Sequence, residues 1–182
     1  EDYVSWLKEQ ANRYQYVVFI AGNHDTLLDG GCYNDAAAKT LMRRQLPQNC
    51  IYLENQSVAL TFPNRQKPIN IYGCPATTSR LESMGRRYYS DAFERTNEQR
   101  IQLWKNIPEQ QGNPIDILLT HTPPTFDDMT ELTYCGPRNQ HTHGAVCTRL
   151  TMYGDPLLTK RLNAMAKSKS APKFHCFGHD HD

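Results

Sequence analysis

Three short apolar runs in this chain each give way abruptly to histidine or asparagine. Residues 16–21 and 115–120 are rich in β-branched and aromatic side chains, and residues 174–177 form a shorter run. Because the runs are continuous rather than alternating, they predict strands that are covered on both faces in an α/β fold. The residues that follow are Asn23 with His24, then His121, then His179 with His181. Loops at the carboxyl ends of such strands collect ligand groups, so these residues are candidates for one common site.

The stretch after the last run contains two histidines separated by a single residue. Side chains at this spacing point apart on an extended backbone, but a turn led by Gly178 lets both imidazoles converge. That geometry suits two adjacent metal ions. Taken alone, the stretch is equally well explained as a solvated chain end or a remnant of expression. Its agreement with two other strand ends favours a metal site.

Composition predicts a globular protein with a single domain. The chain has 182 residues, of which 38% are hydrophobic and 21% charged, and its net charge is +1. These values argue against a disordered chain and against a surface that coats nucleic acid, so no specific nucleic-acid binding is expected. No apolar run approaches the roughly 20 residues that span a bilayer. We see no internal repeat, heptad or low-complexity tract.

The six cysteines are scattered and include no C-x-x-C pair. This spacing argues against a structural zinc site with thiolate ligands. Cys74 and Cys176 fall in apolar runs, where a thiol behaves as a small hydrophobic side chain. We therefore expect reduced cysteines and an intracellular, cytoplasmic protein. Because the chain does not begin with Met, a lost targeting peptide remains an alternative.

Hydrophobic periodicity places further elements between the three runs. Helices are predicted over residues 2–14, 35–44, 97–107 and 155–167, with Ile101, Leu103 and Trp104 facing inward in the third. Strands are predicted over residues 51–53, 57–62 and 69–72, arranged as a meander. Residues 76–95 and 126–147 are predicted as long loops. In the first of these loops, Arg86 and Arg87 are predicted to be solvated surface residues rather than site residues.

The motifs Gly22-Asn23-His24-Asp25, a lone His121, and Gly178-His179-Asp180-His181 resemble those of the calcineurin-like metallophosphoesterases in type and order. The resemblance runs from about residue 16 to the last residue. Within that family the chain is most similar to the small metallophosphoesterase-domain proteins of the brain-239 type. The residues that carry this finer resemblance are Ile71-Tyr72-Gly73-x-Pro75, the run from Asp116 through His121 to Pro124, Gly144-x-x-Cys147, and the run from Pro172 to His179.

The resemblance implies an α/β fold in which a β-sandwich of two sheets is flanked by helices, in α/β/β/α layers. It also implies a centre of two divalent metal ions, Mn²⁺, Fe²⁺ or Fe³⁺, or Zn²⁺, at one edge. If the roles of the matching family residues apply here, Asn23, His121 and His179 ligate one ion and His181 ligates the other. His24 is the general acid that protonates the leaving oxygen, or orients the phosphate, while a bridging hydroxide attacks phosphorus in line. His143 lies in a long loop, where it either reaches the substrate phosphate or metal or is simply solvated.

One part of the family pattern is missing from this chain. An early D-x-H and a G-D-x-x-D motif supply most ligands of one ion and the bridging carboxylate, and neither occurs here. Gly154-Asp155 is followed by Leu158 where a second aspartate would stand. In the family these motifs precede G-N-H-D. We therefore expect residues 1–182 to be one metallophosphoesterase-like domain that lacks its N-terminal portion and its last strands, with at most one well-ligated metal site.

Three functions follow from this pattern. The first is a metal-dependent phosphoesterase, in particular a phosphodiesterase that hydrolyses small nucleotides, cyclic ones among them, or similar phosphate esters. The second is a catalytically impaired subunit or scaffold in a larger assembly, which would have a protein partner. The third is a phosphate- or nucleotide-binding regulator with one residual metal. His24, His179 and His181 favour the enzyme, whereas the missing motifs favour the other two.

Overall fold

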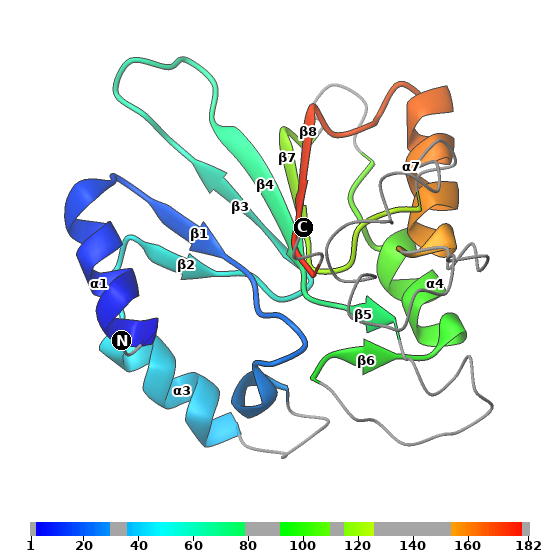
Figure 1. Ribbon diagram of the computed structural model, residues 1–182. Helices are drawn as coiled ribbons and strands as arrows, with labels where there is room; N and C mark the ends of the chain where they lie inside the picture. Colours follow the sequence, from blue (N-terminus) through cyan, green and yellow to red (C-terminus); the bar gives the residue numbers. More distant parts are fainter. Residues whose placement is uncertain (1–2, 30–35, 79–91, 110–114, 126–153, 180–182) are drawn as a thin grey trace, which may run out of the picture.

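Two sheets lie face to face between two pairs of helices in the computed structural model, which describes residues 3–29, 36–78, 92–109, 115–125 and 154–179 (Figure 1). The first sheet pairs β1 (Val17–Phe19) in parallel with β2 (Cys50–Tyr52). The second has the order β3-β4-β7-β8, made of Gln56–Leu60, Ile69–Cys74, Ile117–Thr120 and Phe174–Phe177. Its β3–β4 pair is antiparallel, and its other two pairs are parallel.

The helices form the two outer layers. On the outer side of the first sheet lie α1 (Tyr3–Arg13) and α3 (Ala36–Gln45), and against the second sheet lie α4 (Asn97–Lys105) and α7 (Pro156–Lys167). A 3-10 helix η1 (Thr26–Leu28) and a small parallel pair, β5 (Thr77–Thr78) with β6 (Glu94–Arg95), complete the described elements. The predicted α/β fold with α/β/β/α layers is confirmed, and each of the four predicted helices is present within two residues of its expected ends.

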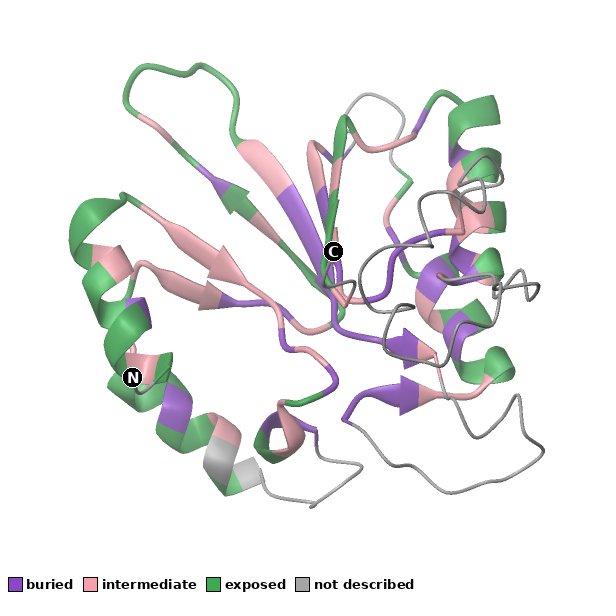
Figure 2. Cartoon of the chain, in the orientation of Figure 1, coloured by how far each residue is buried: buried purple, intermediate pink, exposed green. Residues whose placement is uncertain are grey.

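Three apolar clusters hold the layers together, and Figure 2 shows buried residues in β4 and β7 and in the helices α4 and α7. Between the sheets, Leu53, Leu60 and Ile71 form a cluster with partly buried side chains of β1, β2 and β7. Here Gly73 permits a close approach, because a Cβ at that position would lie 2.5 Å from the Leu53 Cβ and 2.7 Å from the Ile20 Cγ2. The outer clusters are built around Met42, Tyr52 and Phe93 on one side, and around Trp104, Leu118, Leu158 and Met165 on the other.

Strand pairing differs from the predicted meander. Strand β2 pairs with β1 rather than with β3, and only β3 and β4 form a hairpin. The chain changes direction directly after β2, where the Leu53 backbone N–H donates to the Phe19 carbonyl and Asn55 adopts a positive φ of 55°. The short spacing between the runs therefore does not make their strands neighbours.

Burial of the first and last runs is also lower than predicted. Strand β1 is half-buried, and in β8 Phe174 is 67% and Phe177 43% exposed. Strand β8 is the last in the order of its sheet, so pairing covers only one of its edges. Cys176 is exposed rather than packed as a small hydrophobic side chain, and Ile101 is exposed on α4, whereas Trp104 is buried as predicted. The three cysteines of the described ranges, Cys50, Cys74 and Cys176, are free thiols.

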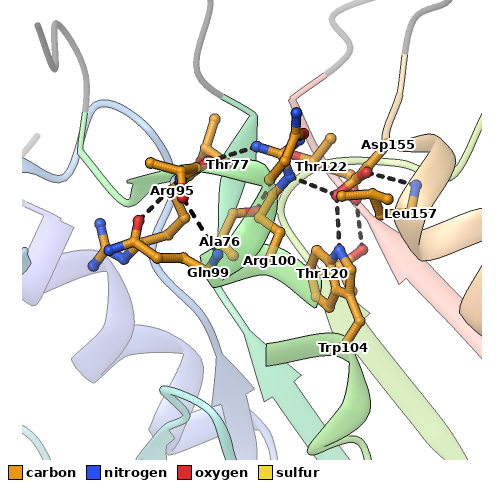
Figure 3. Close-up of polar contacts among 12 residues, drawn as sticks. Ala76, Thr77, Arg95, Gln99, Arg100, Trp104, Thr120, Thr122, Asp155 and Leu157 are labelled. Carbon is orange, nitrogen blue, oxygen red and sulfur yellow. Dashed lines mark hydrogen bonds and ion pairs between the residues drawn. The ribbon is translucent and has the colours of Figure 1, made fainter. Parts of the chain in front are cut away.

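A buried polar network joins the helices of the second outer layer (Figure 3). The Asp155 carboxylate is fully buried and accepts hydrogen bonds from Arg100 Nε at 2.9 Å, from Trp104 Nε1 at 2.7 Å and from the Leu157 backbone N–H at 2.8 Å. The last of these bonds caps the N-terminus of α7, which begins at Pro156. One carboxylate thus fixes α7 relative to α4.

The same network reaches the segment that follows β7. The Asp155 backbone N–H donates to the Pro123 carbonyl at 2.8 Å, and Pro124 forms a bridge with Asp155. Thr159 bonds to both the N–H and the carbonyl of Thr125. The position of residues 121–125 therefore depends on α7.

No helix within the described ranges is long and apolar enough to cross a membrane.

Candidate metal centre

The loops after β1, β7 and β8 meet at one edge of the two sheets. Strands β7 and β8 are parallel neighbours, and their pairing continues past the strand ends, where the Gly178 N–H donates to the His121 carbonyl at 3.1 Å. The loop after β1 approaches from the other sheet. Its Asn23 is 7% exposed and points at His121. The structure thus brings Asn23, His121 and His179 together, and their roles as ligands stay a prediction.

Three side-chain atoms converge there. The distance from His121 Nε2 to Asn23 Oδ1 is 2.8 Å, and the distance from His179 Nδ1 to His121 Nε2 is 3.1 Å. The centroids of the two imidazole rings lie 4.9 Å apart, and the angle between the ring planes is 72°. A single ring nitrogen of His121 is therefore in contact with both other atoms, and one proton there would have to be shared between them.

These spacings fit ligands of one ion. Two atoms that each lie about 2.1 Å from a common ion, at right angles to each other, are separated by about 3.0 Å. All three can present a lone pair, since they are an amide oxygen and two imidazole nitrogens. Within the described ranges no group of three or more His, Cys, Asp or Glu side chains is placed to hold a metal. Among the described residues, the centre is formed by two such side chains, His121 and His179, and by the amide oxygen of Asn23.

Backbone contacts hold the loop after β1 in this position. Asp25 Oδ2 accepts from the Gly22 N–H at 2.6 Å, and the Asn23 carbonyl accepts from the Ala92 N–H at 2.8 Å. Gly22 itself lies against the ring of His121, because a Cβ there would be 2.7 Å from its Cε1. Asp25 therefore orients the turn, as the sequence indicated. Gly22 must be small for Asn23 and His121 to approach each other.

His179 adopts a backbone conformation that is uncommon for a residue with a side chain. Its φ of 69° lies in the left-handed region, which costs a non-glycine residue about 1–2 kcal/mol. The conformation directly follows the end of β8 and places Nδ1 beside His121. Strain of this kind is concentrated at functional sites.

A second polar chain runs beside the centre, and the sequence did not reveal it. His175 Nε2 lies 2.8 Å from Thr120 Oγ1, which donates to the Thr122 carbonyl at 2.8 Å. Because the threonine proton is used for that carbonyl, His175 donates in the first bond through a proton on Nε2. The chain connects β8 to the residues on both sides of His121.

We expect stability to fall in acid because of His175. Burial lowers the pKa of His175 from 6.5 to about 4. Between pH 6.5 and pH 4, His175 is therefore protonated in the unfolded chain but not in the folded chain. Stability is therefore fully present above pH 6.5 and is lost as the pH falls to 4, by about 2–3 kcal/mol from this group. The measurement is urea unfolding between pH 4 and pH 7. The variant His175→Gln keeps a donor for Thr120 but cannot titrate, so an unchanged pH dependence in this variant would contradict the assignment.

The structure places the remaining candidates apart from the three-atom contact or outside its described ranges. His24 is exposed and lines a neighbouring cavity. His181 and His143 lie outside the described residues, as do His141, Arg86 and Arg87. The roles predicted for His181 and His143 stay predictions.

A mixed α/β sandwich with histidines at the ends of its strands defines a metallophosphoesterase type of architecture. The chain belongs to the calcineurin-like phosphoesterase family, whose pattern it matches over residues 1–182. This family consists of metal-dependent phosphoesterases that use divalent ions, and the predicted superfamily is confirmed. The finer assignment to the brain-239 type stays a prediction.

One curated relative is also similar to the chain. It is named "Probable rhamnogalacturonate lyase C", from Emericella nidulans, and is 30% identical over 126 residues, which are 68% of this chain and 10% of that protein. The chain therefore spans about a tenth of the length of the curated relative it matches. No solved structure matches the chain.

Proposed function

We propose that the chain is a metal-dependent phosphodiesterase that hydrolyses small nucleotides, cyclic ones among them, or similar phosphate esters. The observation that carries this proposal is the convergence of Asn23 Oδ1, His121 Nε2 and His179 Nδ1 within 3.1 Å contacts. Membership of the family supports the general class of reaction. In this proposal residues 1–182 act as one domain of that family.

Asn23, His121 and His179 would together hold one metal ion, either divalent (Mn²⁺, Fe²⁺ or Zn²⁺) or Fe³⁺. When bound, such an ion supplies a Lewis acid that neutralises phosphoryl oxygens. An amide oxygen and two neutral imidazoles leave the charge of the ion uncancelled, which favours attraction of an anionic phosphate. His181 is proposed as a ligand of a second ion, and His143 as a contact of the phosphate.

His24 is proposed as the general acid. It follows Asn23 directly but is exposed, so its imidazole is accessible to the substrate. A protonated imidazole can give its proton to the leaving oxygen. Asp25 fixes the turn beside it through the bond to the Gly22 N–H. In this proposal the proton is held by His24, and the metal ion is held by Asn23, His121 and His179.

The full-length protein should release p-nitrophenol from bis-p-nitrophenyl phosphate when Mn²⁺ is added. Dialysis against EDTA should abolish the release, and the return of Mn²⁺, Fe²⁺ or Zn²⁺ should restore it to an extent that ranks the three ions. Comparison with p-nitrophenyl phosphate separates a preference for diesters from one for monoesters. Release that persists unchanged after removal of the metal would refute the proposal.

A second candidate is a catalytically impaired member of the family that serves as a subunit or scaffold. The observation in its favour is that, in the part of the chain that the structure describes, the centre contains no carboxylate ligand. Such a protein would bind a metal ion through the same three side chains. It would bind the ion without hydrolysing either ester, which is the outcome that separates the two candidates.

A further inference from the structure

A cavity of about 370 Å³ lies beside the candidate metal centre. Helix α1 contributes Tyr3 and Val4 to its walls, η1 contributes Leu27 and Leu28, and α3 contributes Leu41 and Met42. Its volume lies within the range of about 300–1,000 Å³ that is usual for sites that bind small molecules. Mostly apolar walls with a few polar groups are also usual for such sites.

One loop contributes residues both to the metal centre and to the cavity. Residues 22–25 form the loop after β1, and its Asn23 reaches the centre through the 2.8 Å contact with His121. The next two residues, His24 and Asp25, line the cavity. A molecule whose phosphate lies at the centre would have to extend past His24, which follows Asn23 in this loop, to place an attached group in the cavity.

The charges around the cavity select among such groups. The lining residues that the structure describes include neither lysine nor arginine, and Asp25 contributes a carboxylate. The field of this carboxylate reaches the opposite wall, since burial together with Asp25 raises the pKa of Tyr3 to about 12. An occupant with a second phosphate would meet this negative charge, and among the described lining residues only the proposed general acid His24 could offset it. An uncharged, apolar or planar group would instead be buried against leucine, methionine and valine side chains.

We infer that the cavity binds the leaving-group part of the substrate, and that this part is an uncharged alcohol with an apolar or planar aromatic body. The inference rests on the proposed function, because it takes the phosphate to lie at the metal centre. It adds the substrate class: esters of aryl-like alcohols or nucleosides, rather than esters whose leaving group carries further phosphates. His24, at the wall, is beside the oxygen that such a leaving group retains.

Two phosphonates that differ only in their organic group test the inference without any turnover. Phenylphosphonate and methylphosphonate resist hydrolysis, and titration calorimetry measures their binding to the full-length protein saturated with Mn²⁺. Burial of the ring should make phenylphosphonate bind about tenfold tighter or more. Equal binding of the two, or binding of neither, would overturn the inference.

One variant and one matched control locate the effect. Leu41 is 59% exposed on α3, so Leu41→Glu leaves the core intact but puts a second carboxylate on the wall of the cavity. It should remove most of the preference for the phenyl group and leave methylphosphonate binding within about twofold. Ile101→Glu is the same kind of change at an exposed position of α4, on the far side of the molecule, and should alter neither.

Failure of the inference can be told apart from failure of the proposed function. Hydrolysis of the diester without a preference for phenylphosphonate would overturn the cavity assignment alone. A preference for phenylphosphonate that Leu41→Glu removes, in a protein that hydrolyses neither ester, would support the cavity assignment and overturn the catalytic proposal.

Discussion

Replacement of Asp155 by alanine is expected to lower the free energy of unfolding by about 3–5 kcal/mol. The carboxylate is fully buried and pairs at 2.9 Å with Arg100, which is itself only 4% exposed. Removal of one member of such a pair leaves the other as a buried charge without its partner, and that penalty is larger than the attraction that is lost. Asp155→Ala also takes the acceptor from Trp104 Nε1 and the cap from α7.

A graded set of variants separates these contributions. Asp155→Asn retains the shape and a cap for α7 but removes the charge, so we expect a loss of about 2–3 kcal/mol. Lys173→Ala breaks the ion pair with Asp116, in which the lysine is 60% exposed, and should lose less than about 1 kcal/mol. Midpoints and slopes of urea unfolding give these values. If Asp155→Ala lost no more than Lys173→Ala, the network would not be a source of stability.

The helices could be predicted from the sequence because each carries a local signal of its own. Leu158 and Met165 lie on one face of α7 and are both buried, and an Asp-Pro pair marks where the helix begins. In α4, Thr96 and Gln99 exchange hydrogen bonds as a capping box. Signals of this kind are read within a few residues of each other, so they do not require knowledge of the fold.

Strand partners and strand burial could not be predicted in the same way, because they depend on distant segments. The run at 174–177 is as apolar as a buried strand, yet Phe174 is 67% exposed, and β8 is the last strand in the order of its sheet among the described residues. Similarly, β2 is close in sequence to β3 but pairs with β1. The apolar character of a run shows that its side chains can pack in a core, but not whether another segment of the chain covers them.

The candidate site was predictable in part. The order of motifs identified Asn23, His121 and His179, which the structure brings together. The contacts that support these residues were not predicted, because no sequence motif indicates them. They are the hydrogen bonds of Thr120 with His175 and the Thr122 carbonyl, and the network around Asp155. An Asp before a Pro at a helix start was the one available signal for Asp155, and it indicated only a cap.

Alanine in place of His121 is expected to remove both metal binding and activity, whereas alanine in place of His24 is expected to remove activity alone. His121 Nε2 contacts both other donor atoms of the centre, so His121→Ala removes the atom that they share. Even residues that only support a metal ligand are worth about 10–100-fold in affinity, and loss of the ligand itself should exceed this. We expect His121→Ala to lose both its metal and its activity.

His24→Ala is the matched control, since it changes another histidine at the same edge of the sheets. It should bind Mn²⁺ as the unmodified protein does, while kcat for bis-p-nitrophenyl phosphate falls by about 10²–10⁴-fold through loss of the general acid. The loss should be smaller for an ester whose leaving group is a better one, because such a group needs less help from a proton. Metal content after dialysis and steady-state kinetics measure the two effects separately. Equal metal content and equal rates in the two variants would refute both assignments, because the proposed division places the ion on His121 and the proton on His24.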